Sequence, residues 1–355
     1  MKYTNKDKIA RIVKLWLIIG IVMVFFQVII GGVTRLTGSG LSITKWEIVT
    51  GTLPPLNNAD WVKEFDLYKQ TPQYSKINKG MSLSEFKFIY FWEYFHRLWA
   101  RSMGFVFLIP FIFFLARGML SRELIRDLGI VILLAIIVAS VGWIMVASGL
   151  INRPWVNAYK LSFHLSLALI LYSYLLWTTF KVFKPRSKVF HNSMLRKLCL
   201  GLVSILAVQI FFGGIMSGMK AGLFYPTWPD MHGEAIPSVL LSGDSWNVDN
   251  FIEYDKTPFM AALVQFVHRG LAYLLITIGL WIFFAGKKAT ISSQYQKAIY
   301  MLISMLVIQV LLGIVTVLKC KGSIPVDFGV YHQGGALLLL SISLYMLYLS
   351  PRVSN

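Results

Sequence analysis

Charged residues are scarce in this chain: Asp, Glu, Lys and Arg make up 14% of its 355 residues, whereas hydrophobic residues make up 56%. Soluble domains carry about a quarter charged residues. The composition therefore argues against a soluble enzyme, a nucleic-acid-binding protein or a disordered scaffold, despite a net charge of +18. Cysteine is also scarce, with two residues. This excludes a disulfide-dense secreted domain and a zinc or iron–sulfur site built from about four thiolates.

Long apolar segments are abundant instead, and each is long enough for a transmembrane helix of about 20 residues. No pattern of alternating hydrophobicity indicates a transmembrane barrel, and lipid cannot satisfy backbone polar groups, so the spans should be helical. The predicted fold class is an all-α integral membrane protein with eight transmembrane helices. The expected spans are 13–33, 88–116, 127–150, 161–180, 198–219, 258–284, 298–318 and 328–349.

Basic residues mark one side of the membrane. Lys and Arg concentrate in the N-terminal segment, in the second, fourth and sixth connections and in the C-terminal tail, while most acids lie in the other connections. The positive-inside rule then places both termini in the cytoplasm. The high isoelectric point, about 9.8, is mainly a topology signal, and the basic connections would face membrane lipid rather than nucleic acid. Without a cleavable signal pattern, a multi-pass protein of the bacterial inner membrane is expected.

An internal repeat divides the chain. The segment QVIIGGVTRLTGSGLSITKW at 27–46 resembles QIFFGGIMSGMKAGLFYPTW at 209–228, and EYFHR at 93–97 resembles QFVHR at 265–269. A third QxxxG pattern occurs at 309–313. Both halves enter the membrane from the same side, which indicates a parallel repeat of two four-helix bundles. The predicted halves are residues 1–184 and 185–355. Their long outer loops, 34–87 and 220–257, are expected to cap them.

Four of the six histidines are placed alike. His191 and His232 lie in loops and are interpreted as surface residues. The other four lie in the first third of the even-numbered spans, which run inward, so all should sit at similar depth near the outer leaflet. Ionisable residues inside a membrane are costly and indicate function. These four are His96, His164, His268 and His332.

Haem iron is the favoured ligand, because imidazoles from facing helices can bind it from opposite sides. The expected pairs are His96 with His164, and His268 with His332. Zinc or copper would require three or four clustered ligands. A proton relay stays open as an alternative, although it does not need pairs at equal depth.

The halves differ beside the first histidine of each pair. Glu93 lies three residues before His96, where the repeat has Gln265, and it is the only acid that we place inside a span. A buried carboxyl group there is a candidate proton carrier, and the alternative is an ion pair with Arg97 that only stabilises the helix. The N-terminal half is therefore the expected reaction site, and the C-terminal half a simpler electron-transfer site. Arg97 and Arg269 are candidate partners for haem propionates, or they extend to lipid headgroups.

These motifs resemble one family over nearly the whole chain. GGVTRLTGSGLSITKW, FWEYFHR, HLSLAL, AGLFYPTWPDM, FVHRGLA and YHQGGALLL are together similar to haem A synthases. The resemblance implies an oxidoreductase that converts the C8 methyl group of haem O to a formyl group through hydroxylated intermediates. It implies haem O bound between His96 and His164, a haem b that passes electrons between His268 and His332, and Glu93 as the family's essential glutamate.

The resemblance also implies partners, namely a haem O synthase and oxidase assembly factors, and a homo-oligomer stays open. The outer loops lack the cysteine pairs of some bacterial relatives. The chain therefore resembles the cysteine-lacking branch, nearer to the alphaproteobacterial and mitochondrial enzymes. Cys199 and Cys320 are expected to be bystanders a membrane thickness apart. Two rival functions remain: a dihaem cytochrome b-like quinol oxidoreductase, and a transporter that uses buried histidines as proton sites.

Overall fold

The computed structural model describes residues 10–44, 53–149, 154–183 and 192–350. Within these ranges the regular secondary structure is helical, apart from one isolated bridge between Met231 and Glu234. Eight helices are long and apolar enough to cross a membrane, and each overlaps a predicted span, so the predicted fold class is confirmed. They are α1 (Arg11–Leu36), α4 (Leu83–Ala116), α5 (Arg122–Gly149), α6 (Ala158–Phe183), α7 (Ser193–Gly218), α10 (Phe259–Lys288), α11 (Ser293–Leu318) and α12 (Val326–Leu349).

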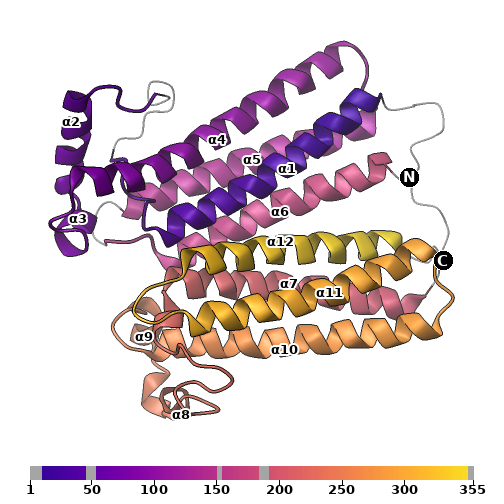
Figure 1. Ribbon diagram of the computed structural model, residues 1–355. Helices are drawn as coiled ribbons and strands as arrows, with labels where there is room; N and C mark the ends of the chain where they lie inside the picture. The colour runs from indigo at the N-terminus through magenta and orange to yellow at the C-terminus, as the bar shows by residue number, and fades with distance from the viewer. Residues whose placement is uncertain (1–9, 45–52, 150–153, 184–191, 351–355) are drawn as a thin grey trace.

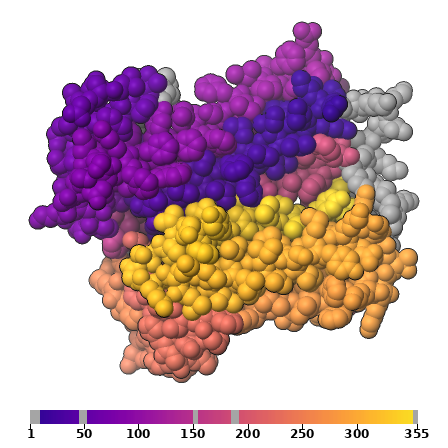
Figure 2. Space-filling view, viewed as in Figure 1, coloured from indigo at the N-terminus to yellow at the C-terminus, as the bar shows by residue number. Residues whose placement is uncertain are grey.

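The eight long helices fall into two groups of four that are consecutive in sequence. In the C-terminal group, α7, α10, α11 and α12 form a ring in which each helix packs against two others of the group. In the N-terminal group, α1 packs against α4 and α6, and α6 packs against α5. The groups meet where α6 packs against α7 and α12, and where α1 packs against α12 (Figures 1 and 2). This arrangement is compatible with two repeated four-helix bundles.

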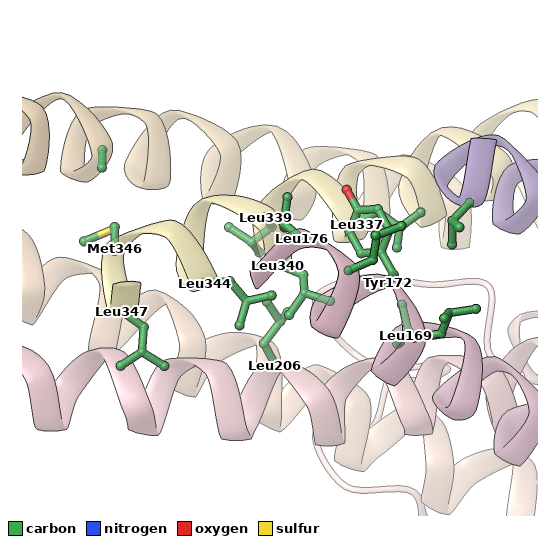
Figure 3. Close-up of a cluster of buried hydrophobic side chains, with 14 of the residues drawn as sticks. Leu169, Tyr172, Leu176, Leu206, Leu337, Leu339, Leu340, Leu344, Met346 and Leu347 are labelled. Atoms are coloured by element: carbon green, nitrogen blue, oxygen red, sulfur yellow. The ribbon is translucent and has the colours of Figure 1, made fainter. Parts of the chain in front are cut away.

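An apolar layer fills the seam between the two groups (Figure 3). Leu176 of α6, Leu206 of α7 and Leu340 of α12 are buried there. A hydrogen bond of 2.8 Å also joins the hydroxyls of Tyr172 on α6 and Ser341 on α12. Because lipid tails are as apolar as leucine, close packing rather than the hydrophobic effect stabilises this seam.

Small residues bring α6 and α7 together. A Cβ atom on Gly218 would lie 2.6 Å from the Cβ of Ala158, and one on Gly214 would lie 2.8 Å from the hydroxyl oxygen of Ser162. Real Cβ contacts are not that short, so both positions require glycine for the helices to approach this closely. The Ser162 hydroxyl uses the proximity to donate a 2.5 Å hydrogen bond to the carbonyl of Phe211.

The repeat equivalent of Gly214 has the same role in the other contact between the groups. Gly32 of α1 packs against the side-chain amide of Gln333 on α12, where a Cβ would lie 2.9 Å from the amide carbon. Nearby, the buried guanidinium of Arg35 donates 2.8 Å hydrogen bonds to the carbonyls of Ser217 and Gly218. These carbonyls lie in the last turn of α7, where helical carbonyls lack an i+4 donor, and that of Ser217 also accepts from the backbone N–H of Lys220 at 3.1 Å. The C-terminal ends of α1 and α7, which belong to different groups, are thus tied together.

The outer loops form helical caps at one end of the molecule, opposite to the end where α1 begins and α12 finishes (Figure 1). The first loop contains α2 (Asn58–Lys69) and α3 (Pro72–Lys76), which pack aromatic side chains on the start of α4. Ser82 and Glu85 form a capping box that starts α4 five residues before the expected span. The second loop contains η2 (Ala221–Leu223), α8 (Ser238–Leu241), η3 (Gly243–Ser245) and α9 (Val248–Ile252).

One sequence prediction about the spans is wrong. Glu93 is not the only acid inside a transmembrane helix, because Asp127 lies within α5 and its side chain is 2% exposed. Its carboxylate is bound by Lys181 of α6 at 2.7 Å and by Arg126 at 3.2 Å. A buried charge is tolerated when it is paired and hydrogen-bonded in this way. Asp127 therefore ties α5 to α6 at the end opposite to the caps.

Candidate functional site

The two histidines of the C-terminal half face each other across their bundle. His268 of α10 and His332 of α12 have ring centroids 6.3 Å apart, with ring planes at 66°. A metal–imidazole bond is about 2 Å long, and a ring nitrogen lies about 1 Å from its ring centroid. Two imidazoles on opposite sides of one ion would therefore have centroids about 6 Å apart. The separation fits an ion between the rings.

The N-terminal half brings its two histidines together on the equivalent helices. His96 lies on α4 and His164 on α6, and the two imidazoles are close enough to interact electrostatically. Both are partly exposed, as are His268 and His332. Among the described residues, no three His, Cys, Asp or Glu side chains gather in one cluster. The histidines thus form two pairs, the arrangement that axial haem ligation requires and a zinc or copper centre does not.

Each imidazole rests against a glycine of a neighbouring helix. The glycines lie five to seven residues before the ends of α1, α5, α7 and α11, so the four histidines share one level of the molecule. A Cβ on any of these glycines would lie 2.8–3.2 Å from an imidazole atom. A larger residue would displace the ring. The contacts are Gly31 with His96, Gly142 with His164, Gly213 with His268 and Gly313 with His332.

Glutamines fix two of the four imidazoles. The side-chain amide nitrogen of Gln27 lies 2.9 Å from Nε2 of His96, and that of Gln309 lies 3.1 Å from Nδ1 of His332. The Gln309 amide also donates to the backbone carbonyl of His332 at 2.8 Å. Metal-binding histidines commonly have one ring nitrogen oriented by such a partner while the other binds the metal.

The other two imidazoles lie beside backbone carbonyls of a neighbouring helix. No side chain of the described residues pairs with Nδ1 of His164 or of His268, but the Val138 carbonyl faces the His164 ring and the Gln209 carbonyl faces the His268 ring. A carbonyl that orients one ring nitrogen leaves the other nitrogen to bind a metal. On α7, Gln209 lies four residues before the contact glycine Gly213. On α5, Val138 lies four residues before the contact glycine Gly142. His164 is therefore the one histidine of the four without a glutamine at this position.

Glu93 lies at the junction of α4 and the first outer loop. Its side chain is 4% exposed. One carboxylate oxygen accepts hydrogen bonds from the backbone N–H of Ser42 at 2.7 Å, the Ser42 hydroxyl at 2.8 Å and the backbone N–H of Ile43 at 2.9 Å. The other oxygen pairs with Arg97 at 2.6 Å. The ion pair considered above is present, but Glu93 does more than stabilise its helix, because it also holds the loop against α4.

Gln265, the repeat equivalent of Glu93, holds the other outer loop with a neutral group. Its amide donates to the carbonyl of Tyr225 at 2.8 Å. Arg269 adds hydrogen bonds to the carbonyls of Thr227 at 2.6 Å and Asp230 at 2.8 Å. The backbone N–H of Gly233 holds the pKa of the Asp230 carboxyl below its usual value, and the Thr227 hydroxyl and the Arg269 charge add to this effect. Both halves thus fasten their loop through the residue three positions before the first histidine.

The two arginines are engaged with protein groups rather than directed at lipid headgroups. Arg97 binds Glu93, and Arg269 binds loop carbonyls. Their predicted contact with haem propionates stays a prediction. Both cysteines are buried, with the thiol of Cys199 3.2 Å from the Tyr295 hydroxyl and that of Cys320 3.2 Å from the Thr316 carbonyl. His191, interpreted from sequence as a surface residue, lies outside the described residues, and so does Trp46 of the repeat.

Sequence reasoning missed two parts of this site. Gly142 escaped notice because Val138 interrupts the QxxxG pattern that marks the other three glycine contacts; a search for the glycine alone, at the same distance from the helix end, would have found it. Ser42 and Ile43 carry no sequence signal, since their hydrogen bonds to Glu93 depend on the path of the loop.

The fold and the site define a class: a multi-pass α-helical membrane protein with two pairs of histidines, of which His268 and His332 face each other. A sequence model of the cytochrome oxidase assembly protein family matches residues 14–344, and the chain belongs to this family.

Individual relatives match over nearly their whole length. "Heme A synthase" of Flavobacterium johnsoniae is 39% identical over 351 residues, which cover 98% of this chain and 99% of that protein. Proteins of the same name from a Bradyrhizobium species and from Nitrosomonas eutropha are 39% and 38% identical, over 96% and 97% of this chain and 92% and 94% of their own lengths.

Proposed function

We propose that this chain is a haem A synthase, an oxidoreductase that converts the C8 methyl group of haem O to a formyl group and so makes haem A for terminal oxidases. The observation that carries the proposal is a pair of matched histidine sites, of which one has an acid, Glu93, where the other has the neutral Gln265. Nearly full-length similarity to proteins named for this activity supports it.

Each half of the chain has its own role in this proposal. The N-terminal half, residues 1–184, binds the substrate haem O between His96 and His164. The C-terminal half, residues 185–355, binds a haem b between His268 and His332. The centroid separation of 6.3 Å supports the second site. When bound, haem b supplies one-electron chemistry, which is what removal of electrons from the substrate requires.

The chain's own residues then position and protect the reacting group. Gln27 and Gly31 orient the imidazole of His96. Glu93 lies about one helical turn from His96 and is the carboxylate closest to it in sequence, so it is placed to accept or return a proton. Arg97 neutralises its charge, and Ser42 keeps the loop closed over this end of the bundle. Arg97 is also the proposed partner of a haem propionate, which would compete with Glu93 for the guanidinium.

Location and partners follow from this proposal. The distribution of basic residues supports a bacterial inner membrane protein with both termini in the cytoplasm. The outer caps would then lie on the periplasmic side. A haem O synthase that supplies the substrate, oxidase assembly factors that receive the product, and a second copy of the chain are the proposed protein partners.

The test is haem extraction after co-expression with a haem O synthase in a host that makes no haem A, with separation by chromatography and mass spectrometry. We expect haem A with the parent chain. Glu93→Gln should stop at haem O or a hydroxylated intermediate, while its matched control, Gln265→Ala, should still give haem A. Unchanged haem O with haem b bound to the parent protein would instead support the dihaem cytochrome, and folded protein that binds no haem would support the transporter.

A further inference from the structure

The two bundles differ in how they are closed. In the C-terminal half α10 packs along α11, so the ring is complete. The equivalent pair in the N-terminal half, α4 and α5, shows no comparable packing between its described residues. In the most apolar stretch of α4 and of α5, 6% of residues are buried, against 22% in α10 and 17% in α11. The N-terminal bundle is therefore not closed by helix packing on its α4–α5 side.

The sequence explains the difference at matched positions. Gly279 and Gly286 of α10 receive the side chains of Leu306 and Ile299 from α11, which lets the two helices approach. The repeat offset of 172 residues places Phe107 and Phe114 of α4 at the same positions. A large aromatic ring therefore stands at each position where α10 has a glycine.

Both phenylalanines pack instead on α1. The ring centroids of Phe107 and Phe114 lie 4.8 Å and 5.4 Å from that of Trp16. Pro110, inside α4, cannot donate a backbone hydrogen bond to the carbonyl of Val106, and the indole N–H of Trp16 takes that carbonyl at 3.0 Å. The contacts of Phe107, Phe114 and Val106 with Trp16 thus hold α4 against α1. They leave α4 apart from α5. Figure 1 shows α4 at the edge of the molecule, diverging from α6 toward its C-terminal end.

The α4–α5 side borders the N-terminal histidine pair. His96 is on α4, and Gly142, against which His164 rests, is on α5. These two helices do not pack along each other in the described part of the chain. The corresponding side of the C-terminal bundle is blocked by the contacts of Leu306 and Ile299.

We infer that the α4–α5 side is where the long apolar chain of the substrate haem lies, extending from the histidine pair toward lipid. This inference rests on the proposed function. Haem O differs from haem b in bearing a long isoprenoid chain, which needs an apolar path out of the ring site. In the C-terminal bundle, the packing of α10 on α11 closes the equivalent side. The open side thus accommodates a haem with an isoprenoid chain at the N-terminal site. The closed side of the C-terminal bundle suits a haem without one.

Gly104 gives the means to test this. It lies eight residues after His96, about 80° around α4 from it, whereas Trp99 lies about 60° in the other direction and donates to the Met23 carbonyl of α1 at 2.9 Å. Gly104 is therefore on the side of α4 turned away from α1. A Cβ there would meet no atom within 4 Å. The C-terminal half has Ile276 at this position.

The experiment is a titration of purified protein in lipid nanodiscs with haem O and, separately, with haem b, followed by the Soret band. The part of the Soret change that is lost in His96→Ala is assigned to haem binding at the N-terminal site. Gly104→Trp should weaken haem O binding there by about tenfold or more, and haem b binding by less than about threefold, because a bulky ring displaces the chain and not the porphyrin. Gly104→Ala should bind both haems like the parent.

Gly270→Trp is the matched control, because Gly270 of α10 is exposed and equally free of neighbours. It should leave both affinities unchanged. Equal weakening of both haems by Gly104→Trp, or no weakening of haem O, would overturn the inference while leaving the proposed function intact. Haem O binding that does not depend on His96 would overturn the proposed function, and this inference with it.

Discussion

Removal of the Glu93 side chain should release the first outer loop from α4. In Glu93→Ala, the backbone N–H groups of Ser42 and Ile43 and the guanidinium of Arg97 all lose their acceptor. A hydrogen bond to a charged group contributes about 1.5–3 kcal/mol, and breaking a buried ion pair costs about 3–5 kcal/mol. These contributions are not additive, because the loop can rehydrate once it opens. We expect a total loss of about 3–5 kcal/mol.

Hydrogen exchange of the Ser42 and Ile43 amides measures this loss directly. Each 1.4 kcal/mol is a factor of about ten in the opening equilibrium, so exchange in Glu93→Ala should accelerate by about a hundredfold or more. Ser42→Ala removes a hydroxyl that donates to Glu93 at 2.8 Å and to the Ile89 carbonyl at 3.3 Å, but it keeps both backbone donors paired. It should therefore accelerate exchange by about tenfold or less. Unchanged exchange in Glu93→Ala would refute the assignment of Glu93 as the residue that holds the loop, whatever the effect on activity.

Three further perturbations test other parts of the structure. Gly142→Ala places a Cβ 2.8 Å from the imidazole of His164, so it should weaken haem binding at the N-terminal site about tenfold or more in a Soret titration, while binding at the C-terminal site persists. Asp230 has a lowered pKa, so its stabilisation of the second loop is present above the usual aspartate pKa of about 4 and is lost as the pH falls below it. Limited proteolysis should therefore cut that loop faster in acid in the parent, whereas Asp230→Asn should be cut at a rate that this titration does not change. Gly214→Val forces α7 away from Ser162 and should lower the midpoint of thermal unfolding, with a cost of about 1–3 kcal/mol; an unchanged midpoint would contradict the close approach.

The spans could be predicted from sequence because each is an apolar run of the length that lipid demands. The outer helices α2 and α3 were missed, since they are short, polar and stabilised by aromatic contacts with α4 that no local pattern reveals. Asp127, the first residue of the expected span 127–150, was not counted as an acid inside a span. Its burial depends on Lys181, 54 positions further along the chain.

The four histidines could be found because equal depth in equivalent helices is a property of the sequence. That His268 and His332 face each other is a property of the packing, which the structure supplies. The contacts of Glu93 were only half predicted: the pair with Arg97 follows from helical spacing, but the hydrogen bonds to Ser42 do not. A local pattern predicts contacts along one helix, whereas contacts between a helix and a distant loop need the fold.

Taken together, the differences between the halves share one location. Glu93 replaces the neutral Gln265, Val138 stands where the other helices have glutamine, and Phe107 stands where α10 has a glycine notch. All three lie on α4 or α5; α4 carries His96, and α5 rests against His164 through Gly142. Differences gathered on the helices beside one histidine pair are what a division between a substrate site and a cofactor site requires. It follows that changes on α4 and α5 should separate the binding of haem O from that of haem b.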